Sequence, residues 1–417
     1  MTALVAALDE GFIRAVSEPT PDPRPFYDRL RGDAPVYRTP LGFWYVTRYD
    51  LAMTIIRNPR DWPANPIALG KRAFHDARSA GSFALETFRA SLMFTDDPKH
   101  KLLRRLVGEL FTPAGVRTLR GKVEGIVTSQ LDDLTGRSSF DLKHDFAERL
   151  PTTVILGLLG IDTAEASRFI ALSDSIAAIL EPRASRETIE AGDAIWRTAA
   201  GRVLLLAEQR RARPSDDLLT KLVTAEVDGQ RLSDDDLVGM VLSLAVAGHE
   251  TTANMLVNGM YHLVIRPESM ALLRADRSLM GSAIEEFLRY EPPPRNSVAR
   301  YPMRDMELGG RRIAAGDTVY VGYQAANHDP AEFPSPHQLD LRRSPNRHLG
   351  LGIGIHHCLG ASLARLELDL ALNQLLDRYP RIELGAPDVS WKPGFVVRAL
   401  TALPLSVGSS ARAIAGA

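Results

Sequence analysis

The sequence is poor in cysteine and has no long apolar segment. Its 417 residues contain a single cysteine, Cys358, so no disulfide can form within the chain, which fits a reducing compartment. The longest strongly apolar stretches, 153–161 and 238–248, are far shorter than the ~20 residues that a membrane span requires. The first residues include no basic start, and two acidic residues interrupt their short apolar run, so they do not resemble a secretory signal. We therefore predict a soluble, cytoplasmic protein with no membrane anchor.

A strong charge of either sign is also absent. The formal net charge is −1 at pH 7, so no global field attracts nucleic acid or anionic membranes. Hydrophobic residues make up 45% and charged residues 24% of the chain, as in ordinary globular proteins. No repeat, low-complexity segment or linker divides the sequence. We predict one unit spanning residues 1–417, mainly α-helical with small β-sheets at one edge.

Local patterns predict the order of the elements. A short helix in PRPFYDRLRGD is followed by a hairpin, in which VYRT and FWYVTRY flank Pro40-Leu41-Gly42. Residues 60–95 look irregular, and such a long loop is often functional. The chain then reads as mostly helical from 97 to about 290. Strands are predicted between 307 and 325, with a turn at Gly309-Gly310, and again after Arg381.

The one cysteine lies in a glycine-rich loop, 350–360, that opens onto a helix. Partial positive charge at a helix N-terminus favours a thiolate over a thiol. A thiolate on an amide-rich loop suits a soft metal, and the spacing matches no zinc pattern, whereas iron in a haem needs only one protein ligand on this side. Two other interpretations stay open from the residues alone, a buried small hydrophobe and a nucleophile with a histidine base.

A second unusual segment interrupts the longest predicted helix, about 234–265, for which Ser233 is a good N-cap. Its middle reads Ala-Gly-His-Glu-Thr-Thr at 247–252, and glycine, an acid and two threonines are poor choices inside a buried helix. A threonine hydroxyl can bind a carbonyl of the helix and open a local groove. The alternative is a helix that tolerates polar residues on a solvated face.

The cysteine loop resembles the haem-ligand signature of the cytochrome P-450 monooxygenases: an aromatic, Gly, any, Gly, any, His, any, Cys, any, Gly. The matching residues are Gly352, Gly354, His356, Cys358 and Gly360. The first position departs, since Leu351 stands where the family usually has phenylalanine, which affects the packing beneath the thiolate. The resemblance implies the fold of that family and Cys358 as the axial ligand of haem b.

The long helix resembles the distal motif of the same family, Ala/Gly-Gly-any-Asp/Glu-Thr. By this match Glu250 is the acid and Thr251 is the hydroxyl beside the dioxygen site. Ala247 and Gly248 keep the space over the iron open. The resemblance implies that protons reach dioxygen through Thr251 and Glu250.

Four further residues match the haem-propionate contacts of the family. His100 and Arg104 share a helix face at i, i+4, although alone they read as part of a solvated basic stripe. Arg300 and His356 match the contacts to the other propionate. Because the four come from three separate segments, coincidence is a poor explanation.

Three residues match the structural element Glu-any-any-Arg of the family. Glu286 and Arg289 are spaced i, i+3, and the third member falls at Arg343. The resemblance implies that this trio holds the scaffold of the cysteine loop and is not catalytic. Taken without the family, such a pair reads as a weak surface ion pair.

The resemblance implies a bacterial-type monooxygenase that inserts one oxygen atom from O2 into a hydrophobic small molecule, by hydroxylation or epoxidation. No flavin or iron–sulfur motif lies in the chain, so a separate ferredoxin- or flavodoxin-type donor with its reductase is expected. A basic patch of Arg105, Arg347, His357 and Arg365 would suit an acidic donor. We expect a monomer. Two alternatives are a peroxide-using haem-thiolate enzyme, which would favour a chain without the acid–threonine pair, and a non-enzymatic haem sensor or carrier.

Expected substrate contacts are mostly apolar, which suits a hydrophobic ligand. They are the loop 60–95 and the residues Ser243, Leu244, Ala247, Arg295, Asn296, Val298, Phe395 and Val396. Arg295 and Asn296 are polar, and they either orient an oxygen-bearing substrate or turn toward haem or solvent.

Overall fold

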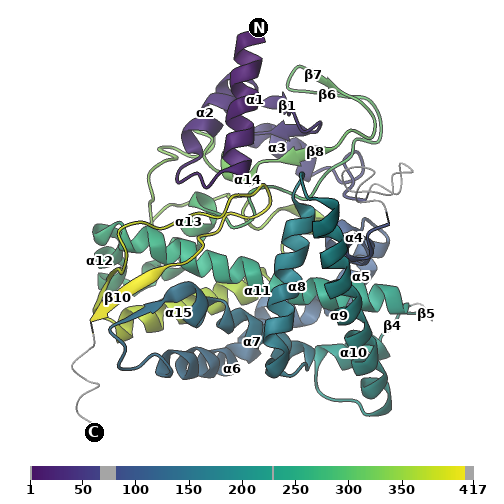
Figure 1. Ribbon diagram of the computed structural model, residues 1–417, viewed down its shortest axis with the longest axis vertical. Coiled ribbons are helices and arrows are strands. Elements are labelled where there is room, and N and C mark those ends of the chain that lie inside the picture. Colours follow the sequence, from purple (N-terminus) through teal and green to yellow (C-terminus); the bar gives the residue numbers. More distant parts are fainter. Residues whose placement is uncertain (1, 66–80, 228–229, 409–417) are drawn as a thin grey trace.

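A computed structural model describes residues 2–65, 81–227 and 230–408. Helices make up most of the described chain (Figure 1). The α-helices are α1 (Thr2–Ser17), α2 (Arg24–Asp33), α3 (Tyr49–Ile56), α4 (Phe83–Arg89), α5 (Lys99–Phe111), α6 (Pro113–Asp132), α7 (Arg149–Leu159), α8 (Ala166–Leu180), α9 (Arg186–Ala212), α10 (Leu218–Thr224), α11 (Asp234–Val264), α12 (Pro267–Ala275), α13 (Met280–Tyr290), α14 (Tyr323–Ala326) and α15 (Ala361–Arg378).

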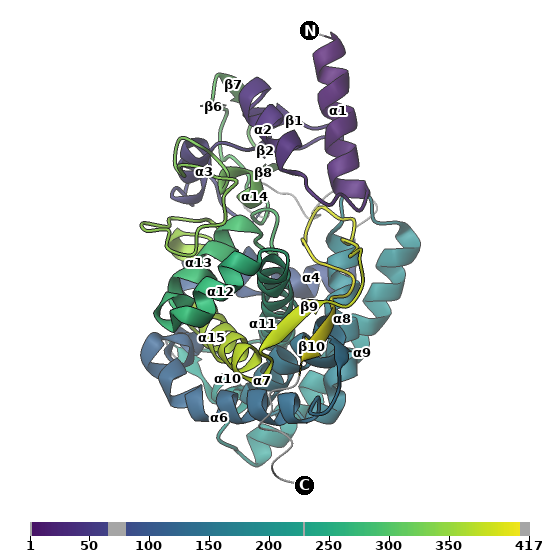
Figure 2. The ribbon, with the colours of Figure 1, turned by 90° about the vertical axis from the view of Figure 1, so that its left-hand side faces the viewer.

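Helix α11 is the centre of the helical part. Figure 2 shows it nearly end-on, with α4, α7, α8, α13 and α15 around it, and all five pack against it. Its 31 residues begin after Ser233, whose Oγ accepts a hydrogen bond of 3.1 Å from the N–H of Asp236. Three acidic residues in the first turn complement the helix dipole. The predicted helix over 234–265 is thus confirmed to within one residue.

The strands are short. They are β1 (Val36–Arg38), β2 (Trp44–Val46), β3 (Ser139–Asp141), β4 (Glu226–Val227), β5 (Gln230–Arg231), β6 (Met306–Leu308), β7 (Arg311–Ile313), β8 (Val319–Val321), β9 (Arg381–Leu384) and β10 (Pro404–Gly408). The predicted first hairpin forms as β1 and β2, and β8 joins it in parallel, with Tyr45 opposite Tyr320. Strand β10 pairs antiparallel with both β3 and β9. The predicted turn at Gly309-Gly310 joins β6 to β7, and both glycines have left-handed φ angles, 54° and 73°.

The segment predicted as an irregular loop, 60–95, is partly helical. It contains α4 and a 3-10 turn, η2 (Leu92–Phe94), while residues 66–80 lie outside the described part. Asp193 on α9 accepts hydrogen bonds from the Ser82 hydroxyl (2.7 Å) and the Ala84 N–H (2.9 Å). The N-terminus of α4 is therefore capped by a residue more than a hundred positions away, which no local pattern reveals.

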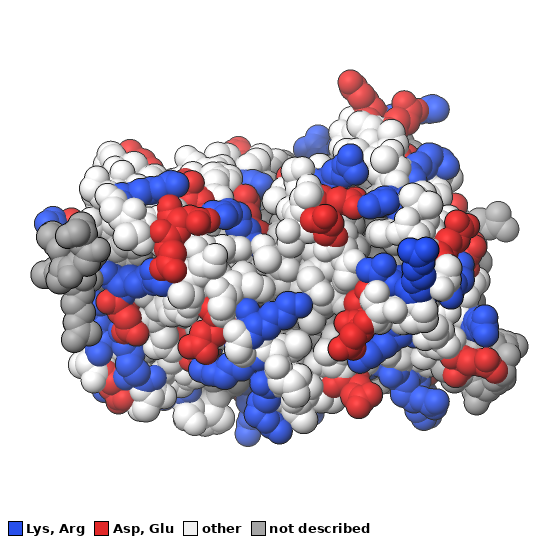
Figure 3. All heavy atoms as spheres, turned by 90° about the horizontal axis from the view of Figure 1, so that it is seen from below, with Lys and Arg blue, Asp and Glu red and all other residues white. Residues whose placement is uncertain are grey.

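The fold is mainly α with small sheets, as predicted. Within the described ranges, every helix is too short or too polar to pass through a lipid bilayer. On the face drawn in Figure 3, basic and acidic side chains are interspersed, in keeping with a formal charge of −1.

Candidate active site

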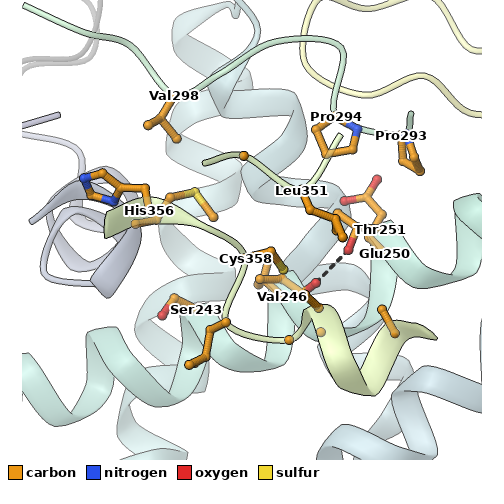
Figure 4. A pocket seen from close by; sticks show the side chains of 18 of the residues that line it. Ser243, Val246, Glu250, Thr251, Pro293, Pro294, Val298, Leu351, His356 and Cys358 are labelled. Atoms are coloured by element: carbon orange, nitrogen blue, oxygen red, sulfur yellow. Dashed lines mark hydrogen bonds between the residues drawn. The ribbon is translucent and has the colours of Figure 1, made fainter. Parts of the chain in front are cut away.

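A cavity of about 390 Å³ lies between α11, the loop before α15 and the segments 293–300 and 395–397 (Figure 4). The cavity brings together the two segments that the sequence analysis singled out, since both Cys358 and the pair Glu250 and Thr251 line it. They are more than a hundred residues apart in the chain. The other lining residues are mostly apolar.

Backbone hydrogen bonds fold the cysteine loop back on itself. The N–H of Cys358 donates to the carbonyl of Leu351 and the N–H of Gly352 to that of Leu349, both at 2.8 Å. Gly350 passes so close to α13 that a Cβ there would lie 2.4 Å from the Leu288 carbonyl oxygen. The loop therefore needs glycine at this crossing, and the crossing positions the Cys358 thiol at the wall of the cavity.

The environment of Cys358 differs from the prediction. Burial raises the pKa of the thiol, and the Gly360 N–H, Arg104 and Arg365 oppose that rise only in part. The prediction relied on the helix terminus, but α15 begins at Ala361, three residues beyond the cysteine. In the protein alone, burial outweighs these three opposing contributions and favours the thiol form.

The threonine-to-carbonyl hydrogen bond expected in the middle of α11 is present. The Thr251 hydroxyl donates to the Ala247 carbonyl at 2.9 Å, drawn as the dashed line in Figure 4. The Gly248 position has a further reason that the sequence analysis did not identify. A Cβ there would lie 3.0 Å from Ile155 Cγ1 on α7, so glycine permits the close packing of α7 against α11.

Glu250 is partly buried, and its pKa is raised to about 7. Burial is the main cause, and the neighbouring Asp174 acts in the same direction. Lys392 and Lys143 oppose the rise. A carboxyl group with this pKa can gain and lose a proton near neutral pH.

Lys143 is a neighbour of Glu250 that the sequence analysis missed. It begins a π-helical turn, η3 (Lys143–Ala147), that packs against α11, and it is only 2% exposed. Its Nζ donates to the Leu400 carbonyl at 2.6 Å and lies 3.8 Å from Glu148 Oε1. Burial lowers its pKa. A buried lysine is rare, but its local sequence contains no signal that would distinguish it from a surface lysine.

The four predicted propionate contacts all line the cavity. The His100 and His356 rings meet edge to face, with centroids 4.7 Å apart. Arg104 Nη1 donates to the Ile355 carbonyl at 3.1 Å, and His356 Nε2 lies 3.5 Å from Asp96 Oδ1. The arrangement therefore holds two arginines and two histidines at one end of the cavity.

Three of these side chains have a buried nitrogen that makes no hydrogen bond within the described residues, and one of the three, His356 Nε2, still lies within ion-pair distance of Asp96. His100 Nε2 and Arg300 Nη1 are buried and have no hydrogen-bond partner among the described residues. Burial lowers the pKa of both side chains, that of His100 to about 4. An unpaired buried guanidinium is costly, so these atoms fit the carboxylates of a bound group such as haem.

The predicted structural trio is assembled, and two of its members, Glu286 and Arg289, are fully buried. Arg289 Nε and Nη2 each donate to a carboxylate oxygen of Glu286 at 2.8 Å, and neither side chain is exposed. Arg343 Nε donates to Glu286 Oε2 at 3.1 Å. Arg289 also donates to the carbonyls of Asn327 and Pro336, both at 2.9 Å. The trio thus ties α13 to the chain that leads into the cysteine loop.

Most predicted substrate contacts line the cavity, but Arg295 does not. The ones that do are Ser243, Leu244, Ala247, Asn296, Val298, Phe395 and Val396. The Arg295 guanidinium is buried instead and donates to Ala15 O and Tyr27 Oη, both at 3.0 Å, and to Gly394 O. Asn296 and Val298 line the cavity, whereas these hydrogen bonds hold the Arg295 guanidinium against α1 and α2. Both expectations for Arg295, substrate contact and a turn toward haem or solvent, are wrong.

The two polar side chains among these predicted contacts, Asn296 and Ser243, form hydrogen bonds within the protein. Asn296 accepts from Tyr45 Oη at 2.8 Å and donates to the Phe395 carbonyl at 2.5 Å. Ser243 Oγ donates to the Met240 carbonyl at 3.0 Å. The cavity therefore offers a ligand mainly apolar contact.

Part of the predicted basic patch is neutralised. Arg365 forms two hydrogen bonds with Glu285, at 2.5 and 2.9 Å, and Arg347 lies 3.8 Å from Glu332. These ion pairs weaken the positive field that a donor protein would meet.

Comparisons with known proteins agree with this geometry. The sequence model of the cytochrome P450 family matches residues 67–391. The chain is 38% identical to cytochrome P450 monooxygenase PikC of Streptomyces venezuelae over 398 residues, which cover 92% of this chain and 91% of that one. It is 35% identical to 6-deoxyerythronolide B hydroxylase of Saccharopolyspora erythraea over 389 residues, covering 91% and 94%. A solved myxobacterial cytochrome P450 in complex with myristic acid superposes with a TM-score of 0.87 at 36% identity, covering 97% and 99%. This chain therefore belongs to the cytochrome P450 family.

Proposed function

We propose that this chain, a haem-thiolate monooxygenase by its family, binds haem b through Cys358. One observation carries the assignment: the cavity that contains the only thiol also contains buried, unpartnered cationic and ring nitrogens, on Arg300 and His100. Arg104 and His356 would complete the contacts to the haem carboxylates. Gly352 and Gly360 also line the cavity, and a Cβ at Gly360 would meet no atom within 4 Å, so this position leaves room for a flat group. When bound, the haem iron supplies the activation of dioxygen that no side chain of the protein can perform.

The proposed catalytic residues are Glu250 and Thr251. Because the Thr251 hydroxyl donates its own hydrogen to Ala247, its oxygen is left to accept a hydrogen bond from the cavity side. Glu250, with a pKa of about 7, is matched to proton exchange at neutral pH. Of its electrostatic neighbours, Asp174 and Lys392 are exposed, whereas Lys143 is buried. Ala247 and Gly248 keep this part of α11 free of bulky side chains.

For the substrate we propose an apolar polyketide, such as a macrolactone. The relative from Saccharopolyspora erythraea is named for hydroxylation of 6-deoxyerythronolide B, and another relative is named a polyketide biosynthesis cytochrome P450. Asn296 and Ser243 already form hydrogen bonds within the protein, which supports a ligand recognised by shape. The electron donor would be a ferredoxin- or flavodoxin-type protein with its reductase, and the working state would be a monomer in the cytoplasm.

The function is tested with purified protein, NADH, a ferredoxin and its reductase, and a panel of macrolactones. We expect a blue shift of the Soret band with at least one compound, and hydroxylated or epoxidised product that requires NADH. Turnover with hydrogen peroxide alone and none with the redox partners would instead support the peroxide-using alternative. Spectral binding without product under either condition would support a haem carrier.

Thr251→Ala should uncouple oxygen consumption from product formation. Without the hydroxyl, no side chain at this position directs where a proton is delivered. NADH oxidation should therefore continue, while product per NADH falls at least about tenfold and hydrogen peroxide rises. The measurement is the ratio of product to NADH, with peroxide assayed in parallel. Thr252→Ala, the next residue on the same helix, is the matched control and should retain coupling. Wild-type coupling in Thr251→Ala would remove this residue from the proton path.

Glu250 should impose a pH dependence on coupled turnover. Its pKa is about 7, so the protonated donor form is present below that pH and is lost as the pH rises through it. Product formation should therefore decline above neutral pH in the wild type, and Glu250→Gln should be slow at all pH values and lack this step. Lys143→Met removes a cation that lowers the Glu250 pKa, so it should move the step to higher pH. An unchanged step in Glu250→Gln would assign the titration to another group.

A further inference from the structure

Glu181 lies directly after α8 and holds a loop that is more than 200 residues further along the chain. Its carboxylate accepts hydrogen bonds from the Phe395 N–H, at 3.0 Å to Oε1 and 2.8 Å to Oε2. The Val396 N–H donates to Oε1 at 3.1 Å. In Figures 1 and 2 this C-terminal loop, drawn in yellow, runs past the end of α8. One carboxylate thus fastens two backbone amides of the loop to the helix.

The loop is shaped to receive the carboxylate. A Cβ at Gly394 would lie 2.9 Å from Glu181 Oε1, and this residue has a φ of 153°, so glycine makes room for the contact. On its other side the loop is attached to the segment 293–296. The Arg398 N–H donates to the Pro293 carbonyl at 2.7 Å, and the Arg295 N–H donates to the Val396 carbonyl at 3.1 Å. The loop belongs to the body of the protein, and Glu181 is the group that reaches it from α8.

The position of Glu181 is unfavourable for α8 alone. The helix dipole disfavours a negative charge at a helix C-terminus, where α8 places this residue. Burial also disfavours the charged carboxylate and raises its pKa, which the two N–H donors and Arg295 counter in part. A carboxylate at this position does not stabilise the helix itself. The hydrogen bonds to the loop are what compensate for it.

Both partners of this contact form walls of the cavity. Ile176, Ala177 and Leu180 line it from α8, and Phe395 and Val396 line it from the loop. A second tie between the same elements, Lys392 to Asp174, is 4.0 Å long and partly exposed, so it contributes little. Separating α8 from the loop at Glu181 would open the cavity between these two walls.

We propose that Glu181 is a positioning residue that latches α8 to the loop 394–397 and so controls the passage of bulky apolar ligands into the cavity. The latch itself is a property of the protein chain, whereas its effect on ligand passage rests on the proposed function. Small ligands do not require α8 to separate from the loop, but a ligand that fills the cavity does.

The latch is tested by hydrogen–deuterium exchange on the purified full-length protein. In Glu181→Ala the peptide that contains Phe395 and Val396 should exchange at least about tenfold faster, because its two amides lose a charged acceptor. Glu181→Gln keeps one acceptor oxygen and should give an intermediate rate. The exposed Glu187 in the first turn of α9 provides the control, and Glu187→Ala should leave this peptide unchanged. Wild-type protection of the peptide in Glu181→Ala would overturn the latch.

Ligand passage is tested by stopped-flow binding of two azoles, clotrimazole as the bulky probe and imidazole as the small one. In Glu181→Ala the association and dissociation rates of clotrimazole should rise about tenfold, while those of imidazole stay at the wild-type values. Unchanged clotrimazole rates, or an equal rise for both probes, would overturn the control of passage. If the protein fails to bind haem, the proposed function falls, whereas the exchange experiment still decides on the latch.

Discussion

Replacing Cys358 with alanine should abolish the strongly red-shifted Soret band that the reduced, CO-treated protein is expected to show. That band requires thiolate ligation, and the chain contains no second cysteine that can substitute for the first. The loop should keep its shape, because its hydrogen bonds, from Cys358 N to Leu351 O and from Gly352 N to Leu349 O, involve only backbone atoms. Haem content should therefore fall less than the amplitude of the thiolate band. The measurement is the reduced-CO difference spectrum at equal haem concentration.

The control for this experiment is the adjacent histidine. His357→Ala changes a side chain of the same loop without touching the proposed ligand, and it should keep the red-shifted band. Cys358→Ala with a band of normal position and amplitude would contradict the assignment of the ligand. A loss of the band in both variants would show that the loop, and not the thiol, had been disrupted.

Removing the carboxylate of Glu286 should have the largest effect on stability. Glu286→Ala leaves Arg289, which is fully buried, without its carboxylate and takes from Arg343 its main charged partner. Breaking a buried ion pair in this way costs about 3–5 kcal/mol, a large share of the roughly 5–15 kcal/mol that typically stabilises a folded protein. We expect low yields of folded protein and loss of haem. Thermal unfolding and haem content per chain measure the effect.

The neighbouring residue offers a matched control. Glu285 carries the same side chain one position earlier, and its carboxylate pairs with Arg365 and His348 while remaining 28% exposed. Because water can partly solvate Arg365 and His348 once the carboxylate is gone, Glu285→Ala should lower the free energy of unfolding by only about 1 kcal/mol. If both substitutions lowered the free energy of unfolding equally, burial would not be the reason that the Glu286 ion pairs stabilise the protein.

Several residues that line the cavity could be singled out from local sequence. The glycines around Cys358, the polar interruption in the helix over 234–265 and the spacing of Glu286 and Arg289 are all features of neighbouring residues. Such features constrain backbone conformation and helix faces directly, so they predicted the elements that the structure contains. The hydrogen bond from Thr251 to Ala247 is of the same kind, since both residues lie within one turn of α11.

Other features depend on partners that are remote in the chain, and only the tertiary structure reveals them. Arg295 turns to Ala15 and Tyr27, and Lys143 turns to Leu400. Nothing near these residues in the sequence indicates that such partners exist, so local sequence predicts neither the buried position of Arg295 nor that of Lys143. The pKa of Cys358 is a similar case. The helix that follows the cysteine can be predicted from the sequence, but the burial that raises the pKa depends on residues that pack over it from elsewhere in the chain. Local patterns therefore determined which groups this protein brings to its cavity. Long-range packing decided their charge, their partners and, at Glu181, what holds the cavity closed.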